Sequence, residues 1–318
     1  MKSEEFRILV VRLGAMGDVI HALPAVASLK HSFPHSRITW VIRPKWSPLL
    51  QGNPFVDEVI EMDRTFGSMV AAAGILRKRR FNLVVDFQAL LQSALVAAWA
   101  RADKKIGLHR SQARERSAAL FYSTAVLTRS AHRVDRNLEL AAAAGASNLL
   151  RVFPVPAGKP EGALPNGKFV LASPEAGWSA KEWPIEFYEE VARGLKMPLV
   201  LNGPPQSAAL LARAPSAQIH FSGIAGLIDA TRRAHAVIGL DSGPMHLAAA
   251  LSKPGVAIFG PTDPAIHGPY GGSLQVLRAP GAATDYKRRA ESDGSMRRIT
   301  PDAVLTALEK GLALKAPA

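Results

Sequence analysis

The sequence has 318 residues and contains no cysteine. This absence excludes disulfide bonds, thiolate metal sites and a cysteine nucleophile. A chain without cysteine also suits a reducing compartment. Catalysis or binding must therefore depend on carboxylates, hydroxyls, imidazoles, basic groups and the backbone.

Long apolar runs are scarce as well. Near the N-terminus, Glu4 and Glu5 precede an apolar run of only four residues, 8–11, which is too short for the core of a signal peptide. The apolar stretch around 90–100 is interrupted by Gln92 and closed by Arg101, so it does not read as a membrane span. We therefore expect a cytoplasmic protein without transmembrane helices.

Acidic residues are outnumbered, with 26 Asp and Glu against 39 Lys and Arg, and the net charge is +13. A basic excess implies an anionic partner, such as nucleic acid, a membrane surface or a phosphorylated substrate. Nucleic acid is not expected, because the sequence lacks zinc-ligand spacing, a recognition-helix signature and an aromatic RNA-binding box. The dense run 77–80, with Arg43 and Lys45, is suited either to anionic lipid or to a helix C-terminus.

Apolar residues make up 48% of the chain, which is enough for two buried cores. Short β-branched runs alternate with segments of helical periodicity, a pattern typical of parallel sheets covered by helices. In the first half this predicts strands at 6–13, 38–42, 57–61 and 81–87, and helices at 19–30, 88–100 and 133–144. In the second half it predicts strands at 168–173, 199–202, 219–221, 236–240 and 256–259, and helices at 185–195, 206–214, 224–234, 245–251 and 302–314.

A segment rich in proline and glycine, 153–167, separates the two halves. We predict an α/β fold of two Rossmann-like, doubly wound domains, 1–155 and 168–318, joined by a linker at 156–167. The domains should face each other across a cleft lined by the loops at the carboxyl ends of their strands. We consider that the last helix, 302–314, packs back on the N-terminal domain.

The loop after the first strand carries Gly14 and Gly17, which allow the backbone to approach a ligand closely. Its spacing is not G-x-G-x-x-G, so a dinucleotide cofactor is disfavoured. Asp18 lies where the helix begins and is either a helix cap or a general base at the cleft. For His21 we favour a structural role.

The turn 241–246 leads from a buried strand into an apolar helix. Ser242 offers a hydroxyl, Gly243 permits close approach, and the first free N–H groups of the helix point outward, which together form a diphosphate site. Asp241 would repel phosphate, so we expect it to bind backbone N–H groups or ligand hydroxyls. His246 is either a donor to phosphate or a buried spacer.

Two further loops carry candidate ligand-binding residues. Lys181 lies in a glycine-bearing loop before a Trp-Pro helix start, where it either neutralises a phosphate or is simply solvated. Thr262 and Asp263 follow a strand and are placed to face the cleft.

Five segments, 14–26, 84–95, 113–122, 181–191 and 239–264, together resemble the heptosyltransferases of lipopolysaccharide core synthesis. This family, glycosyltransferase family 9, has the GT-B fold. Within it the chain most resembles heptosyltransferase I, which adds the first heptose to Kdo on lipid A. The resemblance implies inverting transfer from ADP-L-glycero-β-D-manno-heptose, with no metal and no other cofactor.

The resemblance also implies roles for single residues. Asp18 matches the catalytic base, Lys181 the lysine that holds the donor diphosphate, and Asp241 the aspartate that contacts the heptose. The other residues that we assign to the donor are Ser242, Gly243, His246 and Thr262, and those that we assign to the acceptor are Gly17, Arg114 and Arg136. Residues 1–155 would bind the acceptor and residues 168–318 the nucleotide sugar. We expect a monomer that lies peripherally on the inner face of the inner membrane.

The sequence departs from the family at two donor-side positions. The stretch 176–180 lacks the threonines and the Arg-Asp-Asp run of the family's first transferase, and a family glutamate near the donor ribose is replaced in the turn 204–207. Two alternatives therefore stay open. One is a related transferase for another heptose acceptor or another nucleotide sugar, and the other is a catalytically silent sugar-nucleotide-binding protein.

Overall fold

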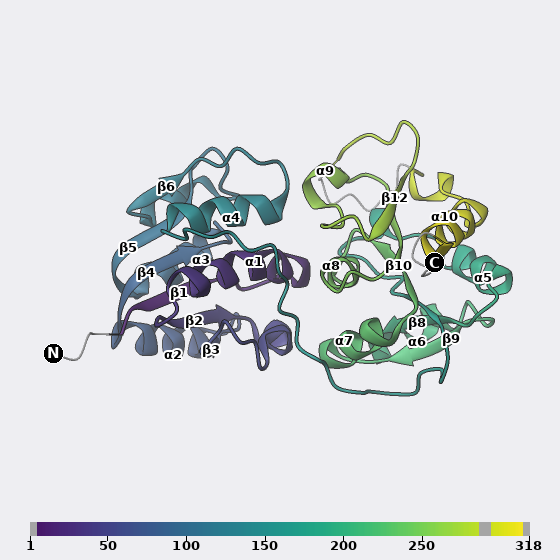
Figure 1. The fold of residues 1–318 in the computed structure, drawn as a ribbon, viewed down its shortest axis with the longest axis horizontal. Coiled ribbons are helices and arrows are strands. Elements are labelled where there is room, and N and C mark those ends of the chain that lie inside the picture. Colours follow the sequence, from purple (N-terminus) through teal and green to yellow (C-terminus); the bar gives the residue numbers. More distant parts are fainter. Residues whose placement is uncertain (1–4, 286–293, 314–318) are drawn as a thin grey trace. The chain divides into compact units, whose positions relative to one another are not determined.

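The computed structural model describes residues 5–285 and 294–313. The chain divides into two compact units, Met1–Pro156 and Ala157–Ala318. The division falls within the segment rich in proline and glycine. Each unit is built on one six-stranded parallel sheet with helices packed on it (Figure 1). The predicted α/β class and the duplication of its pattern are thus confirmed.

The sheet of the first unit has the strand order β3-β2-β1-β4-β5-β6. Its central strand β1 pairs in parallel with β2 and β4. From Ile8 to Val11 this strand is completely buried, because both faces of the sheet are covered. The strands are β1 (Arg7–Val11), β2 (Arg37–Ile42), β3 (Glu58–Glu61), β4 (Arg80–Asp86), β5 (Arg101–Leu108) and β6 (Thr124–Val126).

The helices of the first unit divide between the two faces of this sheet. From β1 the strand order runs one way through β2 and the other way through β4, so right-handed crossovers place the connecting helices on opposite faces. In agreement, α1 packs against α4, whereas α3 packs against α2 and η2. The elements are α1 (Met16–Ser32), η1 (Pro44–Leu50), α2 (Phe66–Arg77), α3 (Leu91–Trp99), η2 (Arg116–Phe121) and α4 (Arg133–Ala143).

The sheet of the second unit has the order β12-β11-β10-β7-β8-β9. Its strands are β7 (Val170–Ala172), β8 (Leu199–Gly203), β9 (Gln218–Phe221), β10 (Ala236–Leu240), β11 (Gly255–Phe259) and β12 (Leu274–Arg278). Its helical elements are η3 (Ser179–Lys181), α5 (Ile185–Gly194), η4 (Pro205–Ser207), α6 (Ala208–Leu211), α7 (Ile224–Arg233), α8 (Gly243–Ala250), α9 (Pro264–His267), η5 (Met296–Arg298) and α10 (Pro301–Ala313).

Helix α10 packs against α5, β11 and β12 of its own unit. Val304, Ala307 and Leu308 of this helix are buried in the core of the second unit, which Trp183 and Tyr188 also enter. The apolar side of the helix is therefore used within the unit. The predicted packing of helix 302–314 on the first domain would have to use a different side of the helix. This packing stays a prediction.

Asp86, at the carboxyl end of β4, is a completely buried carboxyl group. It accepts hydrogen bonds from the hydroxyls of Tyr122 and Ser93, both at 2.7 Å, and from the N–H groups of Gln88 and Ala89. Burial raises the pKa of Asp86, and these hydrogen bonds only partly offset that rise. The carboxylate thereby holds the loop after β4 and the end of η2 together.

We expect Tyr122→Phe to lower the free energy of unfolding by about 1–3 kcal/mol, because it leaves a buried carboxyl group without one of its hydrogen bonds. Tyr188→Phe is the matched control, since the Tyr188 hydroxyl is buried and has no hydrogen-bond partner among the described residues. Its removal should be neutral or stabilising. Urea unfolding measures both variants, and equal losses in the two would contradict the role given to Asp86.

Candidate functional site

The first half-site lies at the carboxyl edge of the first sheet, where the chain passes from β1 into α1. Asp18 is in the first turn of α1, and its Oδ2 accepts a hydrogen bond from the N–H of Ala15, the N-cap residue, at 3.3 Å. Asp18 is therefore not the N-cap itself, but its carboxylate does bind the cap backbone. A negative charge at this end of a helix is favoured by the helix dipole.

Arg12 holds the Asp18 carboxylate from the other side. The two side chains form an ion pair of 2.6 Å between Nη2 and Oδ1, and the Arg12 side chain is only 10% exposed. Its other terminal nitrogen donates a hydrogen bond to the carbonyl of Phe87, after β4. The ion pair thus fixes the carboxylate against the rigid end of the sheet. Arg12 was not among the predicted site residues, although it directly follows a buried strand.

Further arginines surround this pair. The pKa of Arg133, on α4, is lowered first by burial and then by the charges of Arg136, Arg12 and Arg114, while Asp18 opposes the shift. The Nε of Arg133 is buried and has no hydrogen-bond partner among the described residues. The structure therefore brings predicted Asp18, Arg114 and Arg136 into one electrostatic cluster and adds Arg12 and Arg133.

Glycine is required at the tip of this loop. Gly14 has φ of +145°, and a Cβ there would lie 2.5 Å from Nε1 of Trp46. The loop is also tied to β4, because the N–H of Leu13 donates to Oε1 of Gln88 at 2.7 Å. Gly17 is the second residue of α1, and its contact with an acceptor stays a prediction.

His21 points into the first unit. It is 3% exposed, and its ring meets the edge of His132 with centroids 5.6 Å apart. Its carbonyl accepts a hydrogen bond from Asn137 of α4. These contacts fit the structural role favoured for it.

The second half-site lies at the carboxyl edge of the second sheet and centres on Lys181. The Lys181 ammonium lies 2.5 Å from Oδ2 of Asp241 and also donates to the Asp241 carbonyl at 3.0 Å. On another side it lies 4.1 Å from the centroid of the Trp178 ring, a cation–π arrangement. Both charged side chains are largely buried, with 12% of Lys181 and 6% of Asp241 exposed. Lys181 is thus a positioned residue and not a solvated one.

Asp241 is held ionised by its surroundings. Burial on its own raises the pKa of Asp241, but the charges of Lys181 and His246 and the hydroxyl of Thr262 outweigh burial, so the pKa lies below its usual range. The Nε2 of His246 is 3.8 Å from Oδ1 of Asp241. The Asp241 carboxylate pairs with Lys181, because η3 brings that lysine beside the end of β10. The predicted contact of Asp241 with ligand hydroxyls stays a prediction.

Ser242 and the start of α8 offer donors next to this pair. Ser242 is the N-cap residue of α8, but its side chain caps no backbone N–H group. Its hydroxyl is buried and has no hydrogen-bond partner among the described residues. The first N–H groups of a helix also lack partners within the helix. These donors lie in the turn where the sequence predicts an anion site with Gly243, and the binding of an anion there stays a prediction.

Another carboxylate, not predicted from the sequence, lies in the loop after β7 at the same edge of the second sheet. Glu175, in the loop after β7, accepts a hydrogen bond from the Ser207 hydroxyl. Ser207 belongs to the turn 204–207, where the resemblance finds no glutamate. The signal in the sequence is weak, because Glu175 and Ser207 are far apart along the chain and only the pairing of β7 with β8 brings them together.

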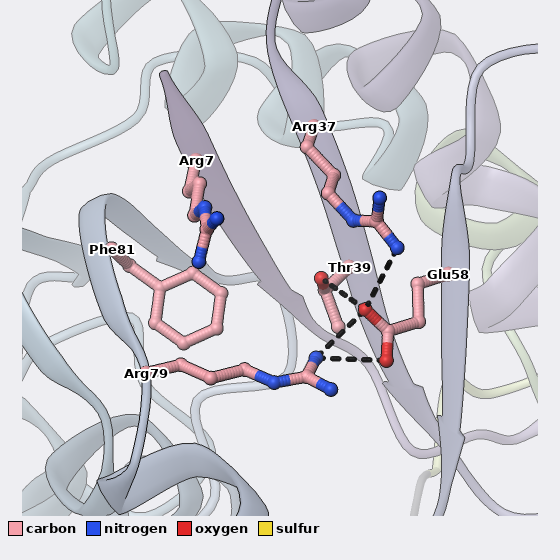
Figure 2. Close-up of a pocket in the computed structure, with 6 residues that line it drawn as sticks. All are labelled: Arg7, Arg37, Thr39, Glu58, Arg79 and Phe81. Atoms are coloured by element: carbon pink, nitrogen blue, oxygen red, sulfur yellow. Dashed lines mark hydrogen bonds and ion pairs between the residues drawn. The ribbon is translucent and has the colours of Figure 1, made fainter. Parts of the chain in front are cut away.

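Within 5–285 and 294–313, no three His, Asp or Glu side chains are grouped so that they could hold a metal ion. The described helices are all too short or too polar to cross a membrane. A pocket of about 210 Å³ lies at the opposite, amino edge of the first sheet, where Arg37 and Arg79 surround Glu58 (Figure 2). It contains none of the predicted site residues.

The sequence is similar to those of known lipopolysaccharide heptosyltransferases. The chain is 29% identical over 297 residues to lipopolysaccharide heptosyltransferase 1 of Pseudomonas aeruginosa, a match that covers 84% of this chain and 82% of that protein. It is 28% identical over 308 residues to lipopolysaccharide heptosyltransferase 1 of Escherichia coli K12, which covers 86% of this chain and 94% of that protein.

Comparisons of structure agree on the fold. The chain resembles the E. coli heptosyltransferase WaaC solved with ADP, with a TM-score of 0.79 and 24% identity over 96% of this chain and 100% of that one. It also resembles E. coli ADP-heptose lps heptosyltransferase II, with a TM-score of 0.76 and 23% identity over 98% of this chain and 99% of that one. These likenesses confirm two Rossmann-like units of the GT-B type.

Residues 69–295 match the model of a single enzyme family, which spans most of both units. The chain therefore belongs to glycosyltransferase family 9, the heptosyltransferases.

Proposed function

We propose that this protein is an inverting heptosyltransferase that moves L-glycero-D-manno-heptose from ADP-heptose to Kdo of lipid A, in the synthesis of the lipopolysaccharide inner core. The observation that carries the proposal is the buried Lys181–Asp241 pair beside the unsatisfied hydroxyl of Ser242. The names of the relatives support the reaction, and a WaaC structure with ADP-2-deoxy-2-fluoro heptose supports the donor.

On the donor side, negative charge builds on the diphosphate as the glycosidic bond breaks. The Ser242 hydroxyl, the N–H groups that begin α8 and the Lys181 ammonium are donors fixed in advance for that charge. When the diphosphate binds, the Lys181 ammonium interacts with a phosphate oxygen as well as with Asp241. Asp241 then accepts hydrogen bonds from the hydroxyls of the heptose, and the neighbouring His246 and Thr262 help to keep its carboxylate ionised. These groups take over the role that a metal has in other transferases.

On the acceptor side, Asp18 removes the proton of the Kdo hydroxyl that attacks the heptose. Arg12 aligns its carboxylate through the 2.6 Å ion pair. Arg114, Arg133 and Arg136 supply positive charge for the carboxylates and phosphates of the acceptor. Gly17 leaves room for the acceptor beside the helix start.

The loops 176–180 and 204–207, which differ from the family pattern, affect how the nucleotide of the donor is bound. A carboxylate at the end of a strand is suited to ribose hydroxyls, and Glu175 brings one to the turn where the family glutamate is replaced. Glu175 therefore allows an ADP-sugar to be held without that glutamate. Two alternatives to this function stay open. The first is a related transferase that uses another heptose acceptor or another nucleotide sugar, and the second is a catalytically silent protein that binds a sugar nucleotide.

Incubation of the purified protein with ADP-heptose and Kdo-lipid A, with mass detection of the product, tests the reaction directly. Addition of one heptose is the expected result. Turnover with a different nucleotide sugar or acceptor would support the first alternative. Donor binding without any turnover would support the second.

We expect Asp18→Asn to lower kcat by about 10²–10⁴ and to leave the affinity for ADP-heptose unchanged, because it removes a general base and no donor contact. Rates from product detection and donor affinity from calorimetry separate the two effects. Asp103→Asn, at a carboxylate whose side chain is 46% exposed, is the matched control and should retain full activity. An Asp18→Asn enzyme that is as fast as the wild type would rule out Asp18 as the base.

We expect Lys181→Met to weaken ADP binding by roughly 10- to 100-fold, because one charge-assisted hydrogen bond to a phosphate contributes about 1.5–3 kcal/mol. The variant leaves Asp241 buried without its cation, so thermal unfolding should be measured beside calorimetry. In the double variant with Asp241→Asn, stability should recover while ADP affinity stays low. Recovery of ADP affinity together with stability would instead give Lys181 a purely structural role.

A further inference from the structure

The amino edge of the first sheet carries two like charges in opposed positions. Arg7 of β1 and Arg37 of β2 are direct partners in the parallel register, so their side chains leave the same face of the sheet. Like charges placed opposite each other on neighbouring strands repel and destabilise the pair. The two side chains are nearly half exposed, at 45% and 48%. The fold thus keeps a repulsive pair at the edge opposite to the predicted site residues.

The opposed arginines belong to the pocket at this edge. The residues that line the pocket come from β1, β2, β3, β4 and the segment before β4, and they are Arg7, Arg37, Thr39, Glu58, Arg79 and Phe81. Figure 2 shows the three guanidinium groups around a common space, with the Phe81 ring on one side. The volume of about 210 Å³ is below the roughly 300–1,000 Å³ of sites for drug-sized ligands. The pocket therefore suits a small ion or a small molecule.

Positive charge exceeds negative charge in this pocket, since three arginines and one glutamate line it. Arg79 compensates the Glu58 carboxylate, because its Nη1 lies 2.8 Å from Oε1 and 2.7 Å from Oε2. The Thr39 hydroxyl donates to Oε2 at 3.4 Å. Arg37 is less closely bound, with its Nη2 3.6 Å from the same oxygen. The carboxylate is thus paired mainly with Arg79.

Arg7 is also weakly compensated. Its Nε lies 3.5 Å from Oε2 of Glu5, whose side chain is 46% exposed. Ion pairs between exposed side chains contribute little, because water screens them. The neighbouring Asn82 oxygen accepts a hydrogen bond from the backbone N–H of Arg7, at 2.9 Å. Since a guanidinium carries five N–H donors, Arg7 and Arg37 can each bind a further anion beside these contacts.

We propose that Arg7 and Arg37 bind a phosphoryl group in this pocket, here called the amino-edge site, either as inorganic phosphate or as a small phosphate monoester. The planar fork of arginine donates two parallel hydrogen bonds to phosphate oxygens. A monoester carries a charge of about −1.5 to −2 at pH 7, which matches the two arginines and removes their mutual repulsion. Glu58 stays paired with Arg79. The amino-edge site is separate from both half-sites, which lie at the carboxyl edges of the sheets.

Thermal unfolding separates this site from a purely structural network. In chloride buffer without phosphate, Arg7→Gln should unfold at the temperature of the wild type or higher, because the repulsion with Arg37 is relieved. At matched ionic strength, added phosphate should raise the unfolding temperature of the wild type more than that of the variant, since a ligand stabilises the state that binds it. A variant that is less stable without phosphate, and equally stabilised by it, would overturn the proposal.

Calorimetry and crystallography test the affinity and the position of the ligand. Arg7→Gln and Arg37→Gln should each weaken phosphate binding at this site by roughly 10- to 100-fold, as expected for loss of a charge-assisted hydrogen bond. Titration with glycerol 3-phosphate beside inorganic phosphate separates the two sources, because tighter binding of the first identifies a monoester site. In crystals soaked with arsenate, a phosphate analogue, the anomalous signal should lie between the two guanidinium groups.

Arg80→Gln is the matched control, because Arg80 lies at the same edge, is 80% exposed and pairs with Asp103 outside the pocket. It should bind phosphate like the wild type. An equal loss of affinity in Arg80→Gln and Arg7→Gln would reduce the effect to general surface charge and overturn the site. Loss of phosphate binding in Lys181→Met but not in Arg7→Gln would place the ion in the second unit. An arsenate signal absent from the pocket would also contradict the proposal.

Discussion

Both units depend on one geometric constraint: parallel strands bring all of their carboxyl ends to the same edge of a sheet. In the second unit, β7, β10 and β11 are neighbours, so Lys181, Asp241 and Thr262 meet although 81 residues separate the first from the last. In the first unit, β1 and β4 are neighbours, which lets Arg12 hold Asp18 while it binds the carbonyl of Phe87. The half-sites are consequences of strand order more than of local sequence.

The two half-sites use charge in opposite ways. In the second unit Lys181 and Asp241 are buried together. Their mutual contact, with the effects of His246 and Thr262 on Asp241, offsets the loss of hydration. In the first unit the Asp18 carboxylate pairs with Arg12 and acts on the charge of Arg133, which the charges of Arg136, Arg12 and Arg114 also affect, so arginines outnumber the carboxylate in this group. The first arrangement suits a leaving group that arrives with its own negative charge. The second suits a base that must remain fixed beside a charged sugar acid.

Buried strands and strongly periodic helices could be predicted from the sequence, and the missed elements have physical reasons. The strand 236–240 is observed with the predicted bounds, because its residues are all buried. The strand β5 was missed because it begins Arg-Ala-Asp-Lys-Lys and its first half is mostly exposed. Helix α2 was missed because Gly67 and Gly74 and its exposed apolar side chains hide the amphipathic pattern. The helix predicted at 206–214 is shorter at both ends, since η4 takes residues 206 and 207 and the chain leaves the helix after Leu211.

For the site, motif reasoning identified the loops but not all the side chains that act in them. Arg133 is three residues before Arg136 on the same side of α4, a spacing that could have identified it. Arg12 and Glu175 depend on strand pairing, which no local pattern encodes. The most direct test of the account is a crystal structure with ADP. The diphosphate should lie at the start of α8, within hydrogen-bond distance of the Ser242 hydroxyl and Lys181 Nζ. A diphosphate bound away from α8, with Lys181 still paired only to Asp241, would contradict it.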